Sequence, residues 1–352
     1  MVQAHPEVEF YFFFDRPFHE KFLFGPNVTP VVLSPPARHP FLFYIWFEFS
    51  VARALEKIKP DVFLSTDGLT CLKTNVPRVT VIHDLAFEHY PKDLGIIVRN
   101  YLQKFTPQVA RASERVIAVS EFTKQDIIQY YGIDPQKIDV VYNDASEFFA
   151  PCSDEESEVT RQKFTNGQPY FMFVGAIHPR KNLVNLFQAF DLFKKQTYSP
   201  AKLLIVGRKA WKSDEITKAF SEMKFQSDVI FTGRVKDEEL RLLYGAALAN
   251  VYVPTLEGFG IPIVEAQKCD CPVITSNVSS MPEVAGESAL LVDPFNVNEI
   301  AHALQEIWKD PGLRITLQYL GRKNLRRFSW DNSAALLWES VLKACPQTNP
   351  VA

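Results

Sequence analysis

The chain has 352 residues, which allows two domains of ordinary size, and its 47% hydrophobic and 22% charged residues are typical of a packed globular protein. The net charge of −3 argues against nucleic acid as the main partner. The five cysteines include Cys269 and Cys271, which are too closely spaced for a zinc-binding pair. We therefore expect free thiols in a cytoplasmic protein, and no metal site.

The opening residues are aromatic but broken by charges, which is not the pattern of a signal peptide. The most apolar run is Phe41–Phe49, and Glu48 and Arg53 interrupt it before the length that a membrane span requires. We expect a buried core helix in this region. A second interpretation makes part of the run a membrane-facing patch, with peripheral contact at the inner face of the membrane.

The first half of the chain alternates short apolar runs with longer helical patterns. The predicted strands are Glu9–Asp15, Pro30–Ser34, Asp61–Ser65, Arg78–Asp84, Arg115–Ser120 and Ile138–Asn143. The predicted helices are Phe41–Lys59, Ile96–Ser113 and Glu121–Tyr131. Continuous apolar strands suit a parallel sheet that is covered on both faces, so this order favours a doubly wound α/β domain.

A polar, acidic segment, Pro151–Glu158, is expected to be a linker, after which the alternation restarts. Its strands are YFMFVGA, KLLIVGR, DVIFTGR, NVYVPT, PVITSN and SALLVDP, and its helices are NLVNLFQAFDLFKKQ, DEELRLLYGAAL and NVNEIAHALQEIWKD. We expect two Rossmann-like α/β domains, 1–150 and 151–328, whose parallel sheets face a cleft between them. Residues 329–352 are expected to form a helix that packs back on the first domain.

Two basic turns follow strands of the second half. In residues 175–182, glycine ends the strand, Arg180 and Lys181 precede a helix, and Asn182 is placed to cap that helix. Residues 207–209 put Arg208 and Lys209 after the next strand. Cations near a helix N-terminus suit a diphosphate. The alternative for the first turn is a basic surface turn that faces water.

The run from Glu257 to Glu265 places two carboxylates eight positions apart around the turn Gly258-Phe259-Gly260. Glycines let the backbone approach a ligand closely, and the amides at a following helix start point at an anion. Carboxylates accept hydrogen bonds from sugar hydroxyls. The run therefore indicates a cradle for a phosphorylated sugar, and an ordinary strand-loop-helix turn with two surface glutamates remains the alternative.

In the first half, one strand ends in His83-Asp84 and another leads into Ser120-Glu121-Phe122-Thr123. A histidine at a strand end can orient a substrate hydroxyl or transfer a proton. A structural His-Asp pair is the commoner case. Ser120 is suited to be a helix N-cap, and the segment could equally form a wall of the site.

Taken together, VIHDLAF, RVIAVSEFTKQDI, VGAIHPRKNL, KLLIVGRKAW, TGRV, EGFGIPIVEA and VSSMPEVAGESALLVDP strongly resemble glycosyltransferase family 4. The likeness runs from about Pro6 to the final helix. It implies the GT-B fold and a retaining enzyme that moves a hexose from a nucleotide diphosphate sugar to a glycan or lipid-linked glycan. The family needs neither metal nor cofactor. Family frequency favours GDP-mannose as the donor and polysaccharide biosynthesis as the setting.

The resemblance also implies roles for individual residues. Glu257 matches the glutamate that contacts the transferred sugar, and His83 matches the first-domain residue near the reacting sugar. Glu265 matches the glutamate that binds the ribose. The remaining implied donor-binding residues are Arg180, Lys181, Arg208, Val235, Gly258, Phe259, Gly260 and Ile261.

Three departures from the family pattern stand out. Ala176 occupies a position where many members have arginine, and Arg180 or Arg208 is expected to supply that charge. Asp270 replaces a glycine at a helix C-terminus, where Asp tolerates the left-handed conformation better than most residues. The chain opens near the family's second strand, without its glycine-rich loop. An alternative function is therefore a catalytically impaired donor-binding or partner subunit of the same fold, and a phosphorylase is a weaker one.

Overall fold

A computed structural model describes residues 1–208 and 214–345, which form two compact units. The first unit joins Met1–Tyr142 to the segment from Trp330 onward, and the second is Asn143–Ser329. The chain therefore leaves the first unit once and returns to it once.

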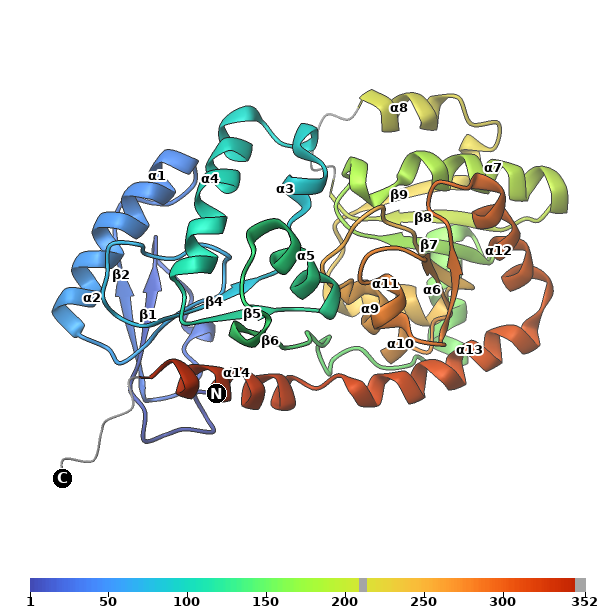
Figure 1. Ribbon diagram of the computed structural model, residues 1–352. Helices are drawn as coiled ribbons and strands as arrows, with labels where there is room; N and C mark the ends of the chain where they lie inside the picture. The colour runs from blue at the N-terminus through green and yellow to red at the C-terminus, as the bar shows by residue number, and fades with distance from the viewer. Residues whose placement is uncertain (209–213, 346–352) are drawn as a thin grey trace. The chain divides into compact units, whose positions relative to one another are not determined.

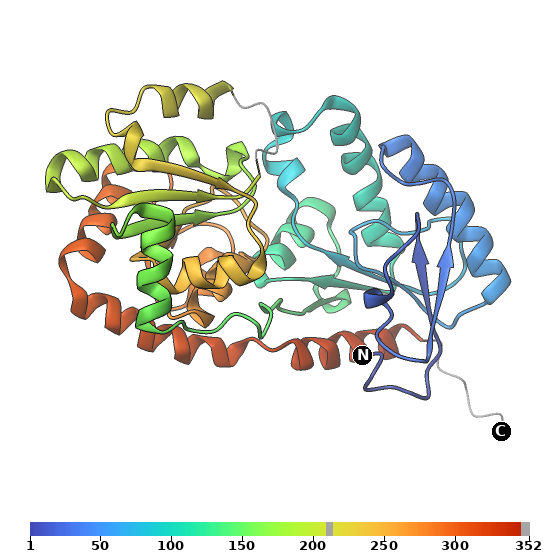
Figure 2. The same ribbon diagram turned by 180° about the vertical axis from the view of Figure 1, so that it is seen from behind.

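The first unit holds two separate parallel sheets. The strands are β1 (Phe10–Phe14), β2 (Val28–Val32), β3 (Phe63–Ser65), β4 (Arg78–Ile82), β5 (Arg115–Ala118) and β6 (Ile138–Val140). All six predicted strands are present, but β1 pairs only with β2, in the register Phe12↔Pro30, while the other four form a sheet in the order β3-β4-β5-β6 (Figure 2). Pro30 has no backbone N–H to donate to a neighbouring strand, so β2 is suited to the edge of a sheet.

The helices of the first unit are α1 (Pro40–Ile45), α2 (Ala52–Ile58), α3 (Ala86–His89), α4 (Ile96–Ala112), α5 (Glu121–Tyr131) and α14 (Trp330–Ala344). Of these, α4, α5 and α14 pack on strands of the four-stranded sheet. One core cluster joins Leu85 of the β4–α3 connection, Val116 of β5 and Ile127 of α5. Ser120 begins α5 as its N-cap and accepts a hydrogen bond from the backbone N–H of Thr123 at 3.0 Å, as expected.

The apolar run Phe41–Phe49, which begins in α1 and continues beyond it, is only partly buried. A π-helical turn, Trp46–Val51, joins α1 to α2, and it buries Trp46 and Phe47 while Phe41 and Phe49 stay exposed. Glu48 is buried too, because its carboxylate accepts the backbone N–H groups of Leu72 at 2.8 Å and Lys73 at 3.1 Å. The prediction of a wholly buried helix was therefore wrong at the two exposed phenylalanines.

Helix α14 belongs to the first unit, although it is the last helix in the described part of the chain. It packs on β4 and β5. The Ser333 hydroxyl donates to the carbonyl oxygen of Tyr142 at 2.6 Å, and the Ser340 hydroxyl donates to the Asp139 carboxylate at 2.8 Å. These bonds tie the returning chain to the end of β6.

The second unit is built on one six-stranded parallel sheet (Figure 1). Its strands are β7 (Tyr170–Val174), β8 (Lys202–Val206), β9 (Val229–Gly233), β10 (Ala249–Tyr252), β11 (Val273–Ser276) and β12 (Ala289–Val292). The order is β12-β11-β10-β7-β8-β9, so the first strand of the unit, β7, lies in the middle between β8 and β10. The residues of β7 and β8 are almost all buried, as predicted for strands covered on both faces.

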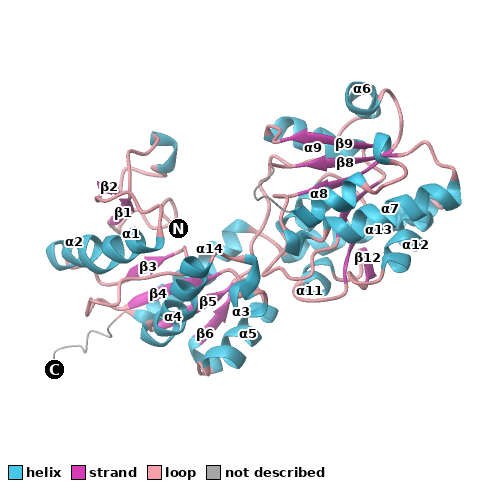
Figure 3. Cartoon of the chain, turned by 90° about the horizontal axis from the view of Figure 1, so that it is seen from above, coloured by secondary structure: helices cyan, strands magenta, loops and turns pink. Residues whose placement is uncertain are grey.

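Helices cover both faces of this sheet, as Figure 3 shows with strands in magenta and helices in cyan. They are α6 (Asp154–Thr165), α7 (Leu183–Thr197), α8 (Asp214–Ser221), α9 (Asp237–Ala246), α10 (Ile261–Lys268), α11 (Met281–Ala285), α12 (Val297–Lys309) and α13 (Pro311–Asn324). Helix α7 packs against α12, and α6 packs against α9. Each predicted helix of this half is present within one or two residues of its expected ends.

The acidic segment that was expected to be a linker begins helix α6 instead. Ser153 and Glu156 form a reciprocal capping box, in which each side chain accepts the other residue's backbone N–H, at 3.1 Å and 2.9 Å. Acidic residues in a first turn also interact favourably with the helix dipole. The prediction of a linker over Pro151–Glu158 was therefore wrong from Asp154 onward.

Candidate donor-binding site

The strand order of the second unit places a topological switch point between β7 and β10. Strands are added on one side of β7 as far as β9 and then on its other side from β10 onward. In open parallel sheets, ligands bind at such a point, outside the carboxyl ends of the strands. The loop after β7 carries Arg180 and Lys181, and the loop after β10 carries Glu257 and the glycine turn. The two predicted ligand-binding segments therefore meet there.

The basic turn after β7 is a 3-10 turn, Pro179–Lys181, which is followed by Asn182 in the left-handed conformation at φ 62°. Asn182 occupies the N-cap position of α7, but its side chain does not cap that helix. Its amide donates instead to the carbonyl oxygens of Val253 at 3.0 Å and Pro294 at 2.7 Å. The predicted cap was therefore wrong, and Asn182 fixes the basic turn to the segments that follow β10 and β12.

Lys181, Glu257 and Tyr252 form a compact cluster. The Lys181 ammonium donates to the Glu257 carboxylate and, at 2.6 Å, to the Tyr252 hydroxyl, and it lies 5.0 Å from the centre of the Tyr252 ring. Arg180 stands 3.7 Å from the same carboxylate. The Lys181 and Glu257 side chains are only 13% and 12% exposed, so water screens their attraction less than at an open surface.

Tyr252 ends strand β10 and is fully buried, with its ring stacked on Phe173 at 6.2 Å. Burial, together with the nearby Glu257 charge, raises the pKa of Tyr252 well above its usual range. The phenol therefore stays protonated. Its oxygen holds the Lys181 ammonium by a hydrogen bond.

The glycine turn leads into α10. Gly260 is the N-cap, at φ 97°, and a Cβ there would lie 2.6 Å from the methyl carbon of Met281. Pro262 has no N–H, and the N–H of Ile263 bonds the Gly260 carbonyl oxygen at 2.9 Å. Within the first turn of α10, the N–H of Ile261 is therefore the one placed to serve an anion.

Two serines after β11 hold the backbone of this turn. The Ser279 hydroxyl accepts the N–H of Glu257 at 3.2 Å, and the buried Ser280 hydroxyl lies 2.8 Å from the carbonyl oxygen of Glu257 and 3.1 Å from that of Phe259. The Phe259 ring packs edge-on against Phe328 at 5.7 Å. Glu257 is thus fixed from both its main chain and its carboxylate.

Glu265 lies eight positions after Glu257, within helix α10. Its Oε2 accepts the Tyr244 hydroxyl at 2.9 Å. Burial raises the pKa of Glu265 above its usual range, and the Tyr244 hydrogen bond offsets part of that rise. Oriented by this bond, the carboxylate is suited to accept hydrogen bonds from a ligand's hydroxyl groups.

The other predicted donor residues lie at the ends of β8 and β9. Arg208 is exposed, and its carbonyl oxygen accepts the N–H of Ile177 from the loop after β7. Val235 is half-buried in the β9–α9 loop. Lys209, the second cation of that predicted basic turn, lies outside the described residues.

His83 belongs to the first unit, directly after β4. Its Nε2 lies 2.8 Å from the carbonyl oxygen of Thr66, which can only accept a hydrogen bond. Nε2 therefore carries a proton and donates it to this bond. The side chain is exposed. Its role near the reacting sugar stays a prediction.

Sequence patterns did not single out Tyr252, Tyr244 or Ser280, which hold the predicted site residues in place. Asp270 was foreseen: it ends α10 in the left-handed conformation at φ 54°, and Arg322 binds its carboxylate through two nitrogens at 2.6 and 2.7 Å. Within residues 1–208 and 214–345, no cluster of three or more His, Cys, Asp or Glu side chains is arranged to hold a metal, and no helix is long and apolar enough to cross a membrane.

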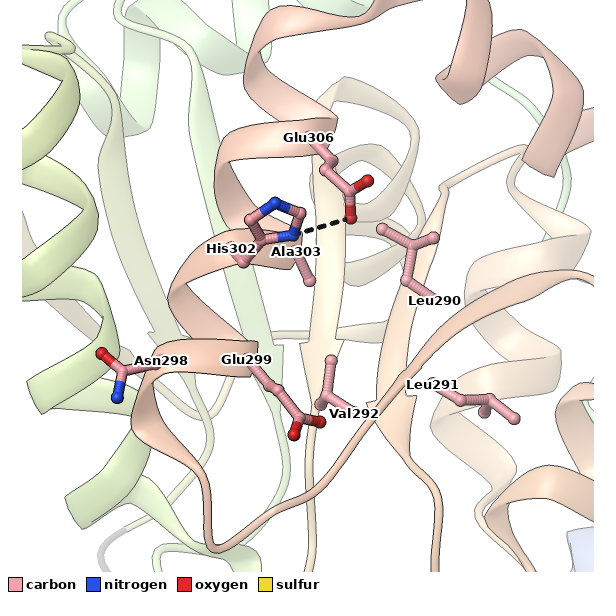
Figure 4. A pocket seen from close by; sticks show the side chains of 8 residues that line it. All are labelled: Leu290, Leu291, Val292, Asn298, Glu299, His302, Ala303 and Glu306. Atoms are coloured by element: carbon pink, nitrogen blue, oxygen red, sulfur yellow. Dashed lines mark ion pairs between the residues drawn. The ribbon is translucent and has the colours of Figure 1, made fainter.

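A hollow of about 400 Å³ lies elsewhere in the second unit, between β12 and α12. Leu290 and Leu291 line its apolar side, and His302 forms an ion pair with Glu306 at 3.3 Å on the helix (Figure 4). None of the predicted site residues lines this hollow, so it plays no part in the site described above.

Comparison with known proteins gives consistent matches. The family described as "Glycosyltransferase Family 4" matches residues 2–143, and "Glycosyl transferases group 1" matches residues 154–324. The O-antigen chain mannosyltransferase B of Escherichia coli is 33% identical over 260 residues, which cover 72% of this chain and 67% of that protein. The O-antigen chain mannosyltransferase RfbU of Salmonella typhimurium is 27% identical over 286 residues, covering 81% and 76%.

Among solved structures, that of the Anabaena protein HepE in complex with UDP and glucose has a TM-score of 0.72 at 17% identity. The match covers 94% of this chain and 91% of that one. At this identity the likeness concerns the fold.

Proposed function

Because the chain belongs to the glycosyltransferases of group 1 and family 4, with the GT-B fold, we propose that it transfers mannose from GDP-mannose to a growing bacterial surface glycan. The chain is a retaining glycosyltransferase that moves a hexose from a nucleotide sugar to a glycan acceptor. Mannose and a surface glycan are suggested by the O-antigen mannosyltransferases, one of which is 33% identical. A cytoplasmic location would match the supply of nucleotide sugars.

The observation that carries the proposal is the meeting of Lys181 and Arg180 with Glu257 beside the start of α10. As the sugar–phosphate bond breaks, negative charge builds on the diphosphate. Cations and the N–H of Ile261 held at this position stabilise such charge, and electrostatic stabilisation of this kind is usually the largest single term in catalysis. Glu257 would then hold hydroxyls of the transferred sugar, and Glu265 would hold those of the ribose.

The proposal is tested first by a donor screen. GDP-mannose is expected to raise the thermal midpoint, because a ligand at 100 times its Kd adds about 2.7 kcal/mol to the stability of the folded state. UDP-glucose and free mannose serve as the comparison ligands. Transfer of labelled mannose to lipid-linked glycans is expected to survive EDTA, since Lys181 and Arg180 stand where a metal would otherwise neutralise the phosphates.

Three results would contradict parts of this proposal. A midpoint shift with UDP-glucose and none with GDP-mannose would reject mannose as the sugar. Loss of turnover in EDTA that Mg²⁺ or Mn²⁺ restores would reject metal independence. Donor binding without transfer to any glycan would favour the alternative of a donor-binding subunit.

We further propose that the first unit touches the membrane surface where α1 and α4 lie side by side. These helices pack through Phe43 on Tyr101 and Tyr44 on Phe105, at ring distances of 6.5 and 5.6 Å. Five large apolar side chains stay exposed along them and the adjoining π-helical turn: Phe41, Phe49, Ile96, Ile97 and Val98. The Lys73 ammonium lies 4.2 Å from the centre of the Phe49 ring, which pairs positive charge with apolar surface. Such a face suits an anionic lipid surface.

Flotation with vesicles that contain anionic lipid tests this contact. The double variant Phe41→Ser/Ile97→Ser is expected to lose most vesicle binding, because both side chains are more than half exposed and their removal costs little in folding. Tyr198→Ser is the matched control, since Tyr198 is 90% exposed in the second unit. Equal flotation of the double variant and the wild type would reject the surface.

A further inference from the structure

Lys181 and Glu257 are partners of each other, although the proposed function gives each a different part of the substrate to bind. The ammonium would bind the diphosphate, and the carboxylate would accept hydroxyls of the transferred sugar. In the structure the two groups form an ion pair, and Arg180 adds a second positive charge 3.7 Å from the same carboxylate. A diphosphate that binds Lys181 therefore competes with Glu257 for the ammonium.

The cost of that exchange depends on what the ligand offers to Glu257. A nucleotide sugar brings hydroxyl donors, so the carboxylate exchanges its ammonium for new hydrogen bonds. A nucleoside diphosphate brings no sugar hydroxyls to Glu257, and it would leave a largely buried carboxylate beside its own negative charges. Removing one partner of a buried ion pair is strongly unfavourable, because the other charge is left uncompensated.

Tyr252 keeps the Lys181 ammonium close both to Glu257 and to the proposed position of the diphosphate. Its buried hydroxyl accepts a hydrogen bond from the ammonium at 2.6 Å, and its ring centre lies 5.0 Å away. These contacts do not involve Glu257, so they can persist while the ammonium changes its anionic partner. The ring cannot move aside, because it is fully buried and stacked on Phe173.

We propose that the Lys181–Glu257 ion pair discriminates between the intact donor and the nucleoside diphosphate product. This inference rests on the proposed function and adds a step to it. Once the sugar has been transferred, Glu257 loses its hydroxyl partners and recovers Lys181, which weakens the hold on the diphosphate. The pair therefore promotes product release and limits product inhibition.

The test is calorimetric titration of the wild type and two variants with GDP and UDP, and with GDP-mannose and UDP-glucose. Glu257→Gln removes the competing charge and is expected to bind the nucleoside diphosphate about three- to tenfold more tightly, while turnover falls. Glu265→Gln is the matched control, because it makes the same chemical change in the same segment but its carboxylate is bonded to Tyr244. It is expected to weaken product and donor alike and to leave the ratio of their Kd values unchanged.

The outcomes separate the inference from the function on which it rests. If the wild type binds GDP or UDP and Glu257→Gln binds it equally or more weakly, the inference is overturned and the proposed function stands. If the wild type binds no nucleoside diphosphate and no nucleotide sugar, both fail. Glu257→Asp serves if Glu257→Gln folds poorly, because it retains the charge but withdraws it by one methylene. An affinity for the nucleoside diphosphate between those expected for the wild type and for Glu257→Gln then supports the inference.

Discussion

Titration of the Lys181→Ala variant with GDP or UDP is expected to show binding that is weaker by about 1.5–3 kcal/mol, the range for hydrogen bonds to charged groups. Two effects act in the same direction. The diphosphate loses a cation that is only 13% exposed, and Glu257 loses its ammonium partner, so its charge then repels the ligand. Calorimetry measures the change directly.

Lys195→Ala is the control for this variant, because Lys195 lies on α7, the helix that follows the basic turn, and is exposed to water. Its affinity for the nucleotide is expected to equal that of the wild type. An unchanged affinity for Lys181→Ala would show that the diphosphate does not bind at the carboxyl end of β7, and the site assignment would fail.

Gly207→Ala is expected to destabilise the second unit by about 3 kcal/mol or more, with little room for relaxation. A Cβ at this position would lie 1.9 Å from the carbonyl oxygen of Gly175, and Gly207 has φ 147°, which L side chains rarely adopt. The carbonyl belongs to the turn after β7, so it cannot shift without moving the basic loop. For a unit of this size each kcal/mol lowers the thermal midpoint by about 2–4 °C.

The control is Gly95→Ala, where an added Cβ meets no atom within 4 Å and φ is negative. Its midpoint is expected to stay within about 1 °C of the wild type, since surface substitutions usually change stability by less than about 0.5 kcal/mol. If Gly207→Ala melted at the wild-type temperature, the close approach of the two glycine turns would not exist in solution.

The sequence was sufficient for the strands and for most helices, because buried parallel strands are uninterrupted apolar runs. The runs KLLIVGR and PVITSN each contain a strand of the second unit, β8 and β11. It was insufficient where a local signal was overlooked or where pairing is long-range. The spacing of Ser153 and Glu156 is that of a capping box and predicts a helix start, but the acidic composition suggested a linker. No local sequence pattern predicts that β2 pairs only with β1.

The candidate site was predictable where it is contiguous. The motif from Glu257 to Glu265, and the pair Arg180 and Lys181, are visible as short patterns. Their partners are not, because Tyr252 and Tyr244 are ordinary apolar positions of a strand and a helix until the fold brings their hydroxyls to a carboxylate or an ammonium. Asn182 was assigned the commoner role of a helix cap, since its long-range acceptors lie 71 and 112 positions away.

The return of α14 to the first unit has a consequence for folding on the ribosome. Asp139 and Tyr142 acquire their partners Ser340 and Ser333 only after the whole second unit has been synthesised. At about 5–20 residues per second, that interval is on the order of 10–40 s. For that time the sheet of the first unit lacks the helix that covers β4 and β5, while the second unit, a continuous stretch of chain, can already complete its fold. A chain truncated after Ser329 and released from the ribosome should therefore present a finished second unit and an unfinished first one that is prone to aggregate.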